Sequence, residues 1–213
     1  MASTQERRAR TAKRLAGSDF PSAAFDVVAI GASAGGLKAL TAVLSPLPPD
    51  LPAAIVVVQH LDRRYPSLMA EILDRSTALD VRQAGEGDVV RPGTVYIAPP
   101  DNHLLVTAGG VLSLSKSELV HFLRPSADPL FASVAATYGD RAIAVVLTGS
   151  GSDGSTGVEA VKAMGGTVIA QDEASSEFRD MPSAAVRTGR VDFVLPLSEI
   201  SAALVSLIRG ATG

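Results

Sequence analysis

Residues 27–40 read VVAIGASAGGLKAL. Apolar residues run directly into a turn of Gly, Ala and Ser, and leucines at helical spacing follow. A buried strand, a glycine-rich turn and a helix in this order form the first half of an α/β unit. Ser33 occupies the turn at the place where a dinucleotide-binding loop has its second glycine. The stretch therefore predicts an α/β fold and raises the question whether Ser33 interrupts a phosphate loop or acts as a nucleophile.

The same alternation of strands and helices continues along the chain. Strands are predicted at 25–31, 53–59, 81–84, 94–99, 141–148, 167–172 and 191–196. Helices are predicted at 35–45, 66–76, 125–138, 158–166, 182–189 and 198–210, with Pro66 starting the second and Ser198 capping the last. Two short apolar runs around Gly109 and Gly110 indicate an antiparallel hairpin near 103–115, inserted at an edge. We predict an α/β fold with a doubly wound, mainly parallel sheet flanked by helices.

Composition excludes several classes of protein. Hydrophobic residues make up 46% of the 213 residues, which is enough for a sizeable core, and the net charge of -3 gives no electrostatic basis for nucleic-acid binding. Cysteine is absent, which excludes disulfides and thiolate metal sites and fits a cytoplasmic protein. A membrane span needs roughly 20 apolar residues in a row, and no apolar run in the sequence approaches that length. No membrane insertion is therefore expected. No cofactor and no metal site are predicted.

The first 25 residues differ from the rest. Five basic residues and one Glu precede a stretch of Ser, Pro and Ala, and no apolar run follows them as a signal peptide requires. We expect residues 1–25 to be a disordered basic tail and residues 26–213 to form one domain.

In a doubly wound sheet, ligands and reactive groups gather beyond the carboxyl ends of the strands. Ser33 follows the first strong strand, His60 follows the second, and Asp153 lies in the glycine-rich turn after the strand at 141–148. Serine, histidine and aspartate are the residue types of a nucleophile, its base and an orienting acid. Each also has a simpler interpretation: Ser33 as a turn or cap residue, His60 as a polar surface or core residue, and Asp153 as the cap of the helix that follows it. The other histidines, His103 and His121, are expected to be exposed loop residues.

A dinucleotide site is a competing interpretation. Gly149, Gly151 and Gly154 match G-x-G-x-x-G between a strand and a helix, and Asp172 follows at about the spacing of the ribose-binding acid. Against it, Asp153 would place a carboxylate at the helix N-terminus, where the pyrophosphate binds. The two glycine-rich loops are therefore better explained by one Ser/His/Asp site.

Several segments together resemble the catalytic domain of the CheB protein-glutamate methylesterases. The resemblance is order-preserving, covers essentially all of 26–209, and is carried by IGASAGG (30–36), VVVQH (56–60), GEGDVVRPGTVYIAPPDNHLLV (85–106), RPSADPLF (124–131), VVLTGSGSDGSTG (145–157) and GGTVIAQDEASSEFRDMPSAAV (165–186).

This resemblance implies the role of each site residue. Ser33 matches the family nucleophile, His60 the general base and Asp153 the acid that orients it. The oxyanion would be held by the backbone N–H groups of Ala34 and Ser150. The implied reaction is hydrolysis of glutamate γ-methyl esters on the cytoplasmic helices of chemoreceptors, and many members also deamidate receptor glutamines.

Three departures from the family pattern are visible. Threonine is frequent in the family at the position of Ala34, and methionine at that of Ser150. CheB proteins usually carry an N-terminal receiver domain, whereas about 25 residues precede this domain, far fewer than the roughly 100 of a domain. We therefore expect a stand-alone enzyme that phosphorylation of such a domain does not control. The alternatives are a non-catalytic CheB-like binding or regulatory module and a dinucleotide-dependent oxidoreductase.

Overall fold

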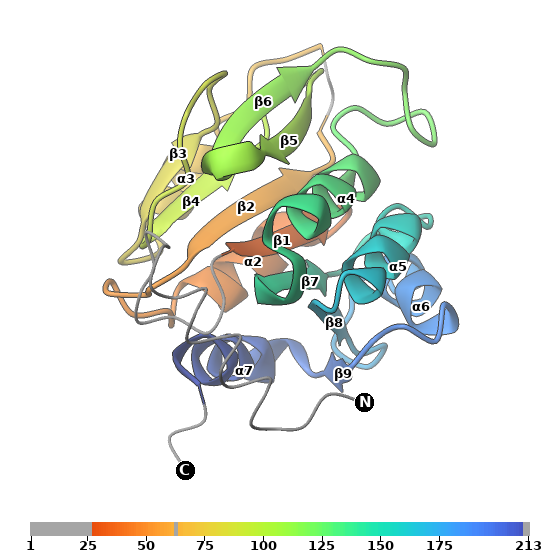
Figure 1. Cartoon of the computed structure of the whole chain (residues 1–213). Helices are drawn as coiled ribbons and strands as arrows, with labels where there is room; N and C mark the ends of the chain where they lie inside the picture. Colours follow the sequence, from red (N-terminus) through yellow and green to blue (C-terminus); the bar gives the residue numbers. More distant parts are fainter. Residues whose placement is uncertain (1–26, 62–63, 211–213) are drawn as a thin grey trace.

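The computed structural model describes residues 27–61 and 64–210. The basic tail predicted at 1–25 lies outside the described residues. Within them, seven strands form one sheet in the order β3-β4-β2-β1-β7-β8-β9, and every neighbouring pair is parallel (Figure 1). The strands are β1 (Val27–Ala32), β2 (Ala54–Gln59), β3 (Asp80–Gln83), β4 (Thr94–Ile97), β7 (Ala142–Val146), β8 (Thr167–Gln171) and β9 (Phe193–Leu195).

The strand β1 lies at the centre of the sheet, and all six of its residues are buried. Ile30 pairs with Val57 of β2 on one side and with Val145 of β7 on the other. Strands that are covered on both faces read as continuous apolar runs, as these three do. The chain adds β2, β4 and β3 on one side of β1, and β7, β8 and β9 on the other. Such a reversal of strand order opens a crevice at the carboxyl ends of the central strands.

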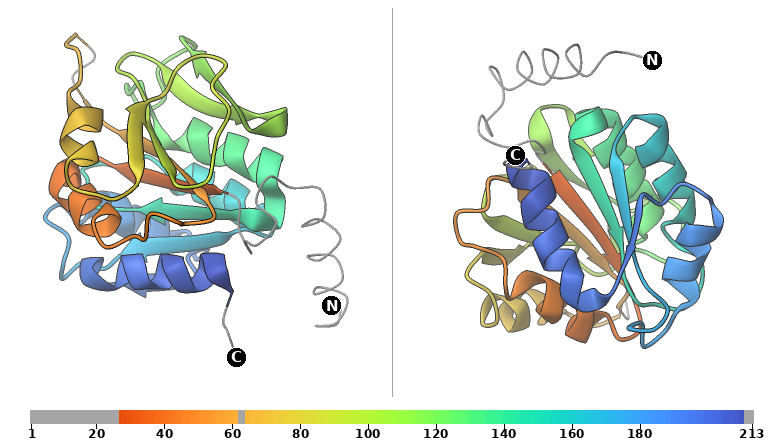
Figure 2. Two further views of the ribbon diagram at one scale, coloured as in Figure 1. Left: turned by 90° about the vertical axis from the view of Figure 1, so that its left-hand side faces the viewer. Right: turned by 90° about the horizontal axis from the view of Figure 1, so that it is seen from below.

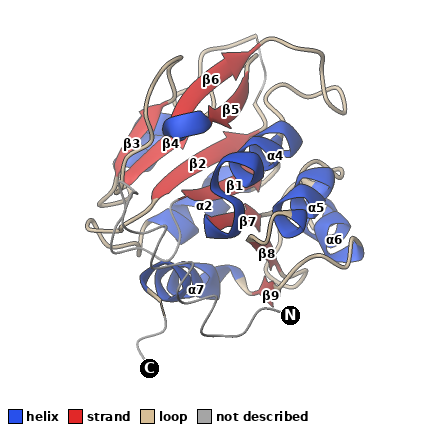
Figure 3. Cartoon of the chain, in the orientation of Figure 1, coloured by secondary structure: helices blue, strands red, loops and turns tan. Residues whose placement is uncertain are grey.

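In the described part of the chain, six α-helices cover the two faces of the sheet (Figures 1 and 2). Helices α2, α3 and α7 lie on one face, and α4, α5 and α6 lie on the other, which gives the three-layer arrangement that Figure 3 colours by element type. The helices are α2 (Gly36–Leu44), α3 (Met69–Asp74), α4 (Ala127–Tyr138), α5 (Ser155–Ala163), α6 (Asp180–Arg187) and α7 (Leu197–Arg209). The predicted doubly wound α/β fold is confirmed.

The predicted hairpin is present as β5 (His103–Thr107) and β6 (Val111–Ser115). It forms its own two-stranded sheet rather than extending the seven-stranded one. The hairpin lies against α4 (Figure 1), and two side chains of that helix bind its backbone: Ser133 Oγ accepts from Val106 N–H at 3.0 Å, and Thr137 Oγ1 donates to Val106 O at 2.9 Å. These contacts fix the position of the hairpin relative to α4.

Two local predictions are wrong. The helix expected from Pro66 begins at Met69, and Pro66 lies outside it. Ser198 does not cap the last helix, because α7 already begins at Leu197 and its cap position is taken by Pro196 in an extended conformation. Proline fixes its own φ and has no N–H to satisfy, so the helix starts directly after it.

Candidate active site

Ser33 and His60 are brought together by strand pairing. Ala32 and Gln59 are partners at the ends of β1 and β2, so the next residue on each strand lies at the same edge of the sheet. The N–H of His60 donates to Ala32 O at 3.1 Å. The buried amide of Gln59 joins the two turns, because its Nε2 donates to Ser33 O at 2.7 Å and to His60 O at 3.0 Å. Backbone pairing and the side chain of Gln59 thereby fix the spacing of Ser33 and His60.

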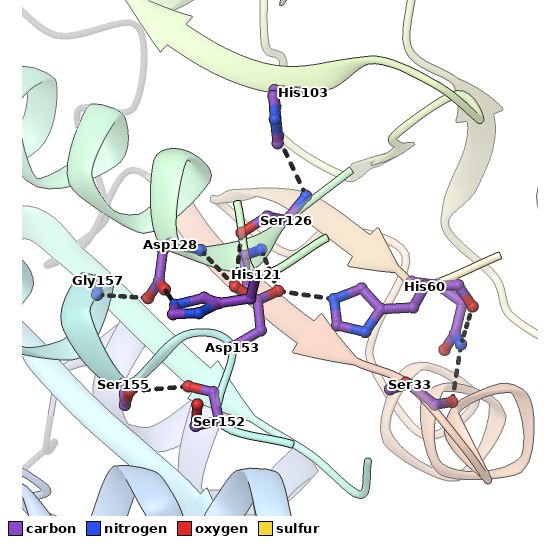
Figure 4. Close-up of polar contacts among 12 residues, drawn as sticks. Ser33, His60, His103, His121, Ser126, Asp128, Ser152, Asp153, Ser155 and Gly157 are labelled. Carbon is purple, nitrogen blue, oxygen red and sulfur yellow. Dashed lines mark hydrogen bonds and ion pairs between the residues drawn. The ribbon is translucent and has the colours of Figure 1, made fainter. Parts of the chain in front are cut away.

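Asp153 reaches the same place from the loop between β7 and α5. Its Oδ2 lies 2.6 Å from Nε2 of His60, and the two side chains are only 1% and 8% exposed. Figure 4 shows the imidazole ring between Asp153 and Ser33, with Ser33 on the side away from the carboxylate. Within 27–61 and 64–210, no hydrogen bond joins the Ser33 hydroxyl to the ring. Catalytic hydrogen bonds are often long before substrate binds, so this geometry is compatible with a serine–histidine pair.

The hydrogen bond to Asp153 also sets the tautomer of His60. An ionised carboxylate only accepts hydrogen bonds, so the proton of a neutral ring sits on Nε2. Nδ1 is then the free base of the ring and the atom available to Ser33. Asp153 therefore binds Nε2 of the ring, and Nδ1 has the role of accepting the serine proton. In chymotrypsin-like proteases the two ring nitrogens have the opposite roles.

The carboxylate of Asp153 lies at the N-terminus of α4. Its Oδ1 accepts from Ser126 Oγ at 2.5 Å and from the N–H of Asp128 at 3.2 Å, and its Oδ2 accepts from the N–H of Ala127 at 2.6 Å. Burial raises the pKa of Asp153, but the hydrogen bonds from His60, Ser126 and Ala127 outweigh burial and hold the pKa below its usual value. Asp153 therefore stays ionised beside His60.

The simpler interpretation of Asp153, as cap of its own helix, is wrong. The cap position of α5 is Gly154, with no side-chain hydrogen bond. The carboxylate that serves α5 is Asp128, whose Oδ1 accepts from the N–H of Gly157 at 2.7 Å (Figure 4). Burial raises the pKa of Asp128, and the nearby charge of Asp153 raises it further.

These contacts disfavour a dinucleotide site at Gly149–Gly154. Asp128 occupies the positively polarised N-terminus of α5, where a pyrophosphate would bind. Asp172, at the spacing of the ribose-binding acid, accepts instead from the N–H and the hydroxyl of Ser175 at 2.9 and 2.5 Å. A carboxylate therefore occupies the predicted position at the N-terminus of α5. It belongs to Asp128, whereas the sequence predicts Asp153 there.

The two predicted oxyanion donors lie on neighbouring turns at the same edge of the sheet. Ser33 N–H donates to Thr148 O at 3.0 Å, and Gly149 N–H donates to Phe178 O at 2.8 Å. These two hydrogen bonds fix Ser33 and Gly149, which directly precede the predicted donors Ala34 and Ser150. In the described part of the chain, the N–H groups of Ala34 and Ser150 donate to no protein acceptor. Two unused backbone donors on neighbouring turns are what an oxyanion hole requires.

The glycines of these turns make room for protein atoms. A Cβ on Gly31 would lie 2.8 Å from Cβ of Ala127, and a Cβ on Gly36 would lie 1.9 Å from Oε1 of Gln59. The glycines therefore serve the close packing of the turn against α4 and Gln59.

The remaining histidines differ from each other. His121 is half-exposed in a loop, as predicted, and its Nε2 lies 3.4 Å from Oδ2 of Asp128. The prediction for His103 is wrong, because this residue is 1% exposed at the start of β5. Its Nδ1 accepts from Ser126 N–H at 3.2 Å, and its Nε2 lies 3.1 Å from Glu118 O.

Sequence reasoning gave no role to Ser126. The signal lay in the order Ser126-Ala127-Asp128-Pro129, which reads as the start of a helix. A capping serine normally accepts from the N–H two or three residues on, but Pro129 has no N–H to donate, and the N–H of Asp128 donates to Oδ1 of Asp153. Ser126 Oγ therefore caps neither residue, and its hydroxyl donates to Asp153, a contact that only the folded chain reveals.

A cavity of about 630 Å³ opens beside Ser33. Its lining is mainly apolar and includes Leu37, Leu61 and Met69, with Gln59 and Lys38 as polar neighbours. Next to it, α3 and the residues before it expose Tyr65, Leu68 and Ile72. Ser33 thus lies at the border of an apolar surface.

Neither a metal centre nor a membrane span is found within 27–61 and 64–210. These residues contain no group of three or more His, Asp or Glu side chains arranged to hold a metal ion. None of their helices has both the length and the apolar character needed to cross a bilayer.

Comparison with known proteins gives consistent matches. The family model described as CheB methylesterase matches residues 28–204. A Moorella thermoacetica protein named protein-glutamate methylesterase/protein-glutamine glutaminase is 46% identical over 190 residues, covering 87% of this chain and 45% of the relative. An Anaeromyxobacter dehalogenans protein of the same name, numbered 2, is 50% identical over 184 residues, covering 86% and 54%. The chain spans about half the length of these curated relatives.

Among solved structures, the crystal structure of the Thermotoga maritima CheB methylesterase catalytic domain superposes with a TM-score of 0.84 at 40% identity. The match covers 86% of this chain and 98% of that domain. The similarity therefore extends over nearly the whole of one catalytic domain.

Proposed function

The chain belongs to the CheB methylesterase family, and we propose that it is a serine hydrolase that demethylates glutamate γ-methyl esters on the cytoplasmic helices of chemoreceptors. The relatives' names support the reaction, which is hydrolysis of a methyl ester on a glutamate of a protein. The observation that carries the proposal is the 2.6 Å contact between His60 and an ionised Asp153, at the strand end adjacent to Ser33.

In the first half of the reaction, Nδ1 of His60 takes the proton of the Ser33 hydroxyl while Oγ attacks the ester carbonyl. The carbonyl oxygen becomes an oxyanion, which accepts hydrogen bonds from the N–H groups of Ala34 and Ser150. The positive ring is stabilised by Asp153. Collapse of the tetrahedral intermediate breaks the bond to the methoxy group, and His60 protonates it to methanol.

In the second half, a water molecule attacks the acyl-serine with His60 again as base. The same two N–H groups hold the second oxyanion. The bond to Ser33 Oγ breaks, the proton returns from His60 to the serine, and a glutamate carboxylic acid is released. The balance is one ester and one water giving one acid and one methanol, and no step requires a metal or cofactor.

The surface around Ser33 fits a protein substrate. The cavity lined by Leu37, Leu61 and Met69 offers an apolar place for residues that flank the ester. The exposed Leu68 and Ile72 extend this surface along α3. A methylated helix can rest on such a surface while it presents one side chain to Ser33. This assignment places the enzyme in the cytoplasm, where those receptor helices lie.

Deamidation of receptor glutamines is a second activity that the relatives' names favour. The chemistry differs only in the leaving group: His60 protonates an amine, and ammonia leaves in place of methanol. The same acyl-serine then forms, so both activities depend on the same three side chains.

The test is methanol release from a methylated receptor by the wild type and by Ser33→Ala. We expect turnover to fall by about 10⁴-fold or more, as when a serine nucleophile is removed from other hydrolases. Within the described residues, no hydrogen bond uses the Ser33 hydroxyl, so the melting temperature of the variant should match that of the wild type. Near wild-type turnover in Ser33→Ala would refute the mechanism.

The two alternatives give different results. A non-catalytic module would release no methanol as wild type, yet its receptor binding would survive Ser33→Ala. A dinucleotide-dependent oxidoreductase would bind NAD or NADP saturably and lose that binding on Gly151→Ala. The occupied N-terminus of α5 argues against the second outcome.

A further inference from the structure

Ser126 is a fully buried serine whose hydroxyl is committed to one contact. It lies at the cap position of α4 in an extended conformation but makes no capping hydrogen bond with its own helix. The hydroxyl donates to Oδ1 of Asp153 at 2.5 Å. A donor this close to an ionised acceptor makes a charge-assisted hydrogen bond, which is stronger than a neutral one.

The two carboxylate oxygens of Asp153 have different hydrogen-bond partners. Oδ1 binds Ser126 and, at 3.2 Å, the N–H of Asp128, while Oδ2 binds the N–H of Ala127 and the ring of His60. If the hydroxyl were removed, Oδ1 would keep only the longer of its two contacts. Apart from the contact with His60, only the N–H groups of Ala127 and Asp128 would then hold the carboxylate against rotation about its Cβ–Cγ bond. Oδ2 would be oriented less firmly toward Nε2 of His60.

The position of Ser126 is fixed from behind by His103. The N–H of Ser126 donates to Nδ1 of His103 at 3.2 Å, so that nitrogen carries no proton. The ring proton therefore sits on Nε2 and is donated to Glu118 O at 3.1 Å. Arg124, two residues before Ser126, is held in turn by Asp101 at 2.7 Å and by the carbonyl of Ser117 at 2.8 Å.

We propose that Ser126 is a positioning residue, whose hydroxyl, held in place by His103, orients Asp153 and through it the base His60. The proposal rests on the proposed function only in taking Ser33 as a nucleophile activated by His60. It does not depend on which ester is the substrate. The series His103, Ser126, Asp153, His60 connects the hairpin to the edge of the sheet where Ser33 lies (Figure 4).

A purely structural role makes different predictions. If Ser126 served only to join α4 to the loop before α5, its removal would lower stability and leave the reactivity of folded protein unchanged. The test must therefore measure Ser33 reactivity in folded protein, independently of receptor binding.

A fluorophosphonate ester provides that measurement, because it reacts with an activated serine by forming a P–O bond to Oγ with loss of fluoride. We would compare the wild type, Ser126→Ala and Ser133→Ala by the maximal rate of labelling at Ser33 and the half-saturating reagent concentration. Ser133 is the matched control, since its hydroxyl also lies on α4 but contacts Val106 and Leu130 rather than Asp153.

We expect Ser126→Ala to lower the maximal labelling rate by about 10- to 100-fold, the range for one hydrogen bond to a charged group, with the half-saturating concentration unchanged. Ser133→Ala should label at the wild-type rate even if it melts earlier. The proton resonance of the His60 ring N–H should also move in Ser126→Ala and stay in place in Ser133→Ala.

Folded Ser126→Ala that labels within twofold of the wild type, with an unmoved ring resonance, overturns the proposal. If Ser126→Ala does not fold, Ser126→Cys replaces the hydroxyl by a somewhat larger thiol, which is a weaker donor, and the same comparison applies: a several-fold loss supports the proposal, and a wild-type rate overturns it. Wild-type protein that is labelled at Ser33 but releases no methanol from receptor contradicts the proposed substrate alone. Wild-type protein that is not labelled contradicts both proposals.

Discussion

Asp153 and Asp128 each bind the N-terminus of the other's helix. The carboxylate of Asp153, in the loop before α5, accepts from the first N–H groups of α4, and the carboxylate of Asp128, in the first turn of α4, accepts from an N–H of α5. Each helix N-terminus is thus served by an acid from the other. The two acids are not equivalent, because their environments shift the pKa of Asp153 down and that of Asp128 up. The acid that contacts His60 is the one held ionised.

Replacing Asp153 by Asn should abolish most activity. An amide can place an N–H toward Nε2 of His60, which leaves the proton on Nδ1 and the ring unable to accept from Ser33. We expect turnover to fall by about 10⁴-fold, as for the equivalent change in a serine protease. Stability at pH 7 should also fall, by about 1–3 kcal/mol, since the buried donors lose an ionised acceptor.

Urea unfolding at several pH values measures the predicted loss of stability in Asp153→Asn. Because the folded state lowers the pKa of Asp153, its contribution to stability is present above about pH 4 and is lost as pH falls below that value. The difference in unfolding free energy between wild type and Asp153→Asn should therefore become smaller at acid pH. Asp50→Asn is the control, since Asp50 is mostly exposed and pairs with Arg209 at the surface. A gap that widens in acid would contradict this account.

Replacing Asp128 by Asn should have the opposite pH dependence. A raised pKa means that the folded chain takes up the proton first, so the stability it contributes is present at low pH and lost as pH rises through the folded value. From pH 7 to pH 4, the unfolding free energy of wild type should rise relative to that of Asp128→Asn in urea unfolding. The charged groups facing Asp128 are Asp153 and His121, so the slope is repeated in a His121→Gln background. A slope of the other sign in both backgrounds would show that Asp128 is stabilised as an anion.

Adding a methyl group at Gly149 should displace the nucleophile. A Cβ there would lie 2.3 Å from Sδ of Met181 and 2.7 Å from Cβ of Ser33. We expect Gly149→Ala to cost about 1–3 kcal/mol of stability and to lower Ser33 labelling by at least about tenfold, since small misplacements of reacting groups are costly. Gly85→Ala is the control, because the atom nearest its Cβ is the end of the Asp88 side chain at 3.2 Å. Equal labelling by both variants would rule out a role for Gly149 in placing Ser33.

The buried acceptor on His103 can be tested by stability alone. His103→Leu leaves the N–H of Ser126 without an acceptor in the interior, and we expect it to lower the free energy of unfolding by about 1–3 kcal/mol. In His103→Asn, the side-chain oxygen stands where Nδ1 stood and keeps that hydrogen bond, so the loss should be smaller. Urea unfolding of the two variants decides the point. If both lose the same stability, the hydrogen bond to Ser126 contributes nothing measurable.

The sequence by itself determined the architecture of the sheet. Runs such as VVAIGA and AIVVVQ are apolar at nearly every position, which only strands covered on both faces require, and glycine and proline mark where they end. Because parallel strands all end at one edge, the residues after β1, β2 and β7 had to meet there. This rule alone is sufficient to predict that Ser33, His60 and Asp153 lie together.

Only the tertiary structure decided which groups surround Asp153. Its partners on α4 are distant in sequence, and their contact depends on how α4 and α5 pack against each other. That packing also places Asp153 within reach of the Ser126 hydroxyl. The packing of the hairpin on α4 buries His103, for which local sequence predicts an exposed loop. Local patterns report the period of a strand or helix, whereas the direction of a hydrogen bond between two helices is set by their relative position. The residues that orient the acid are therefore visible only in the folded chain.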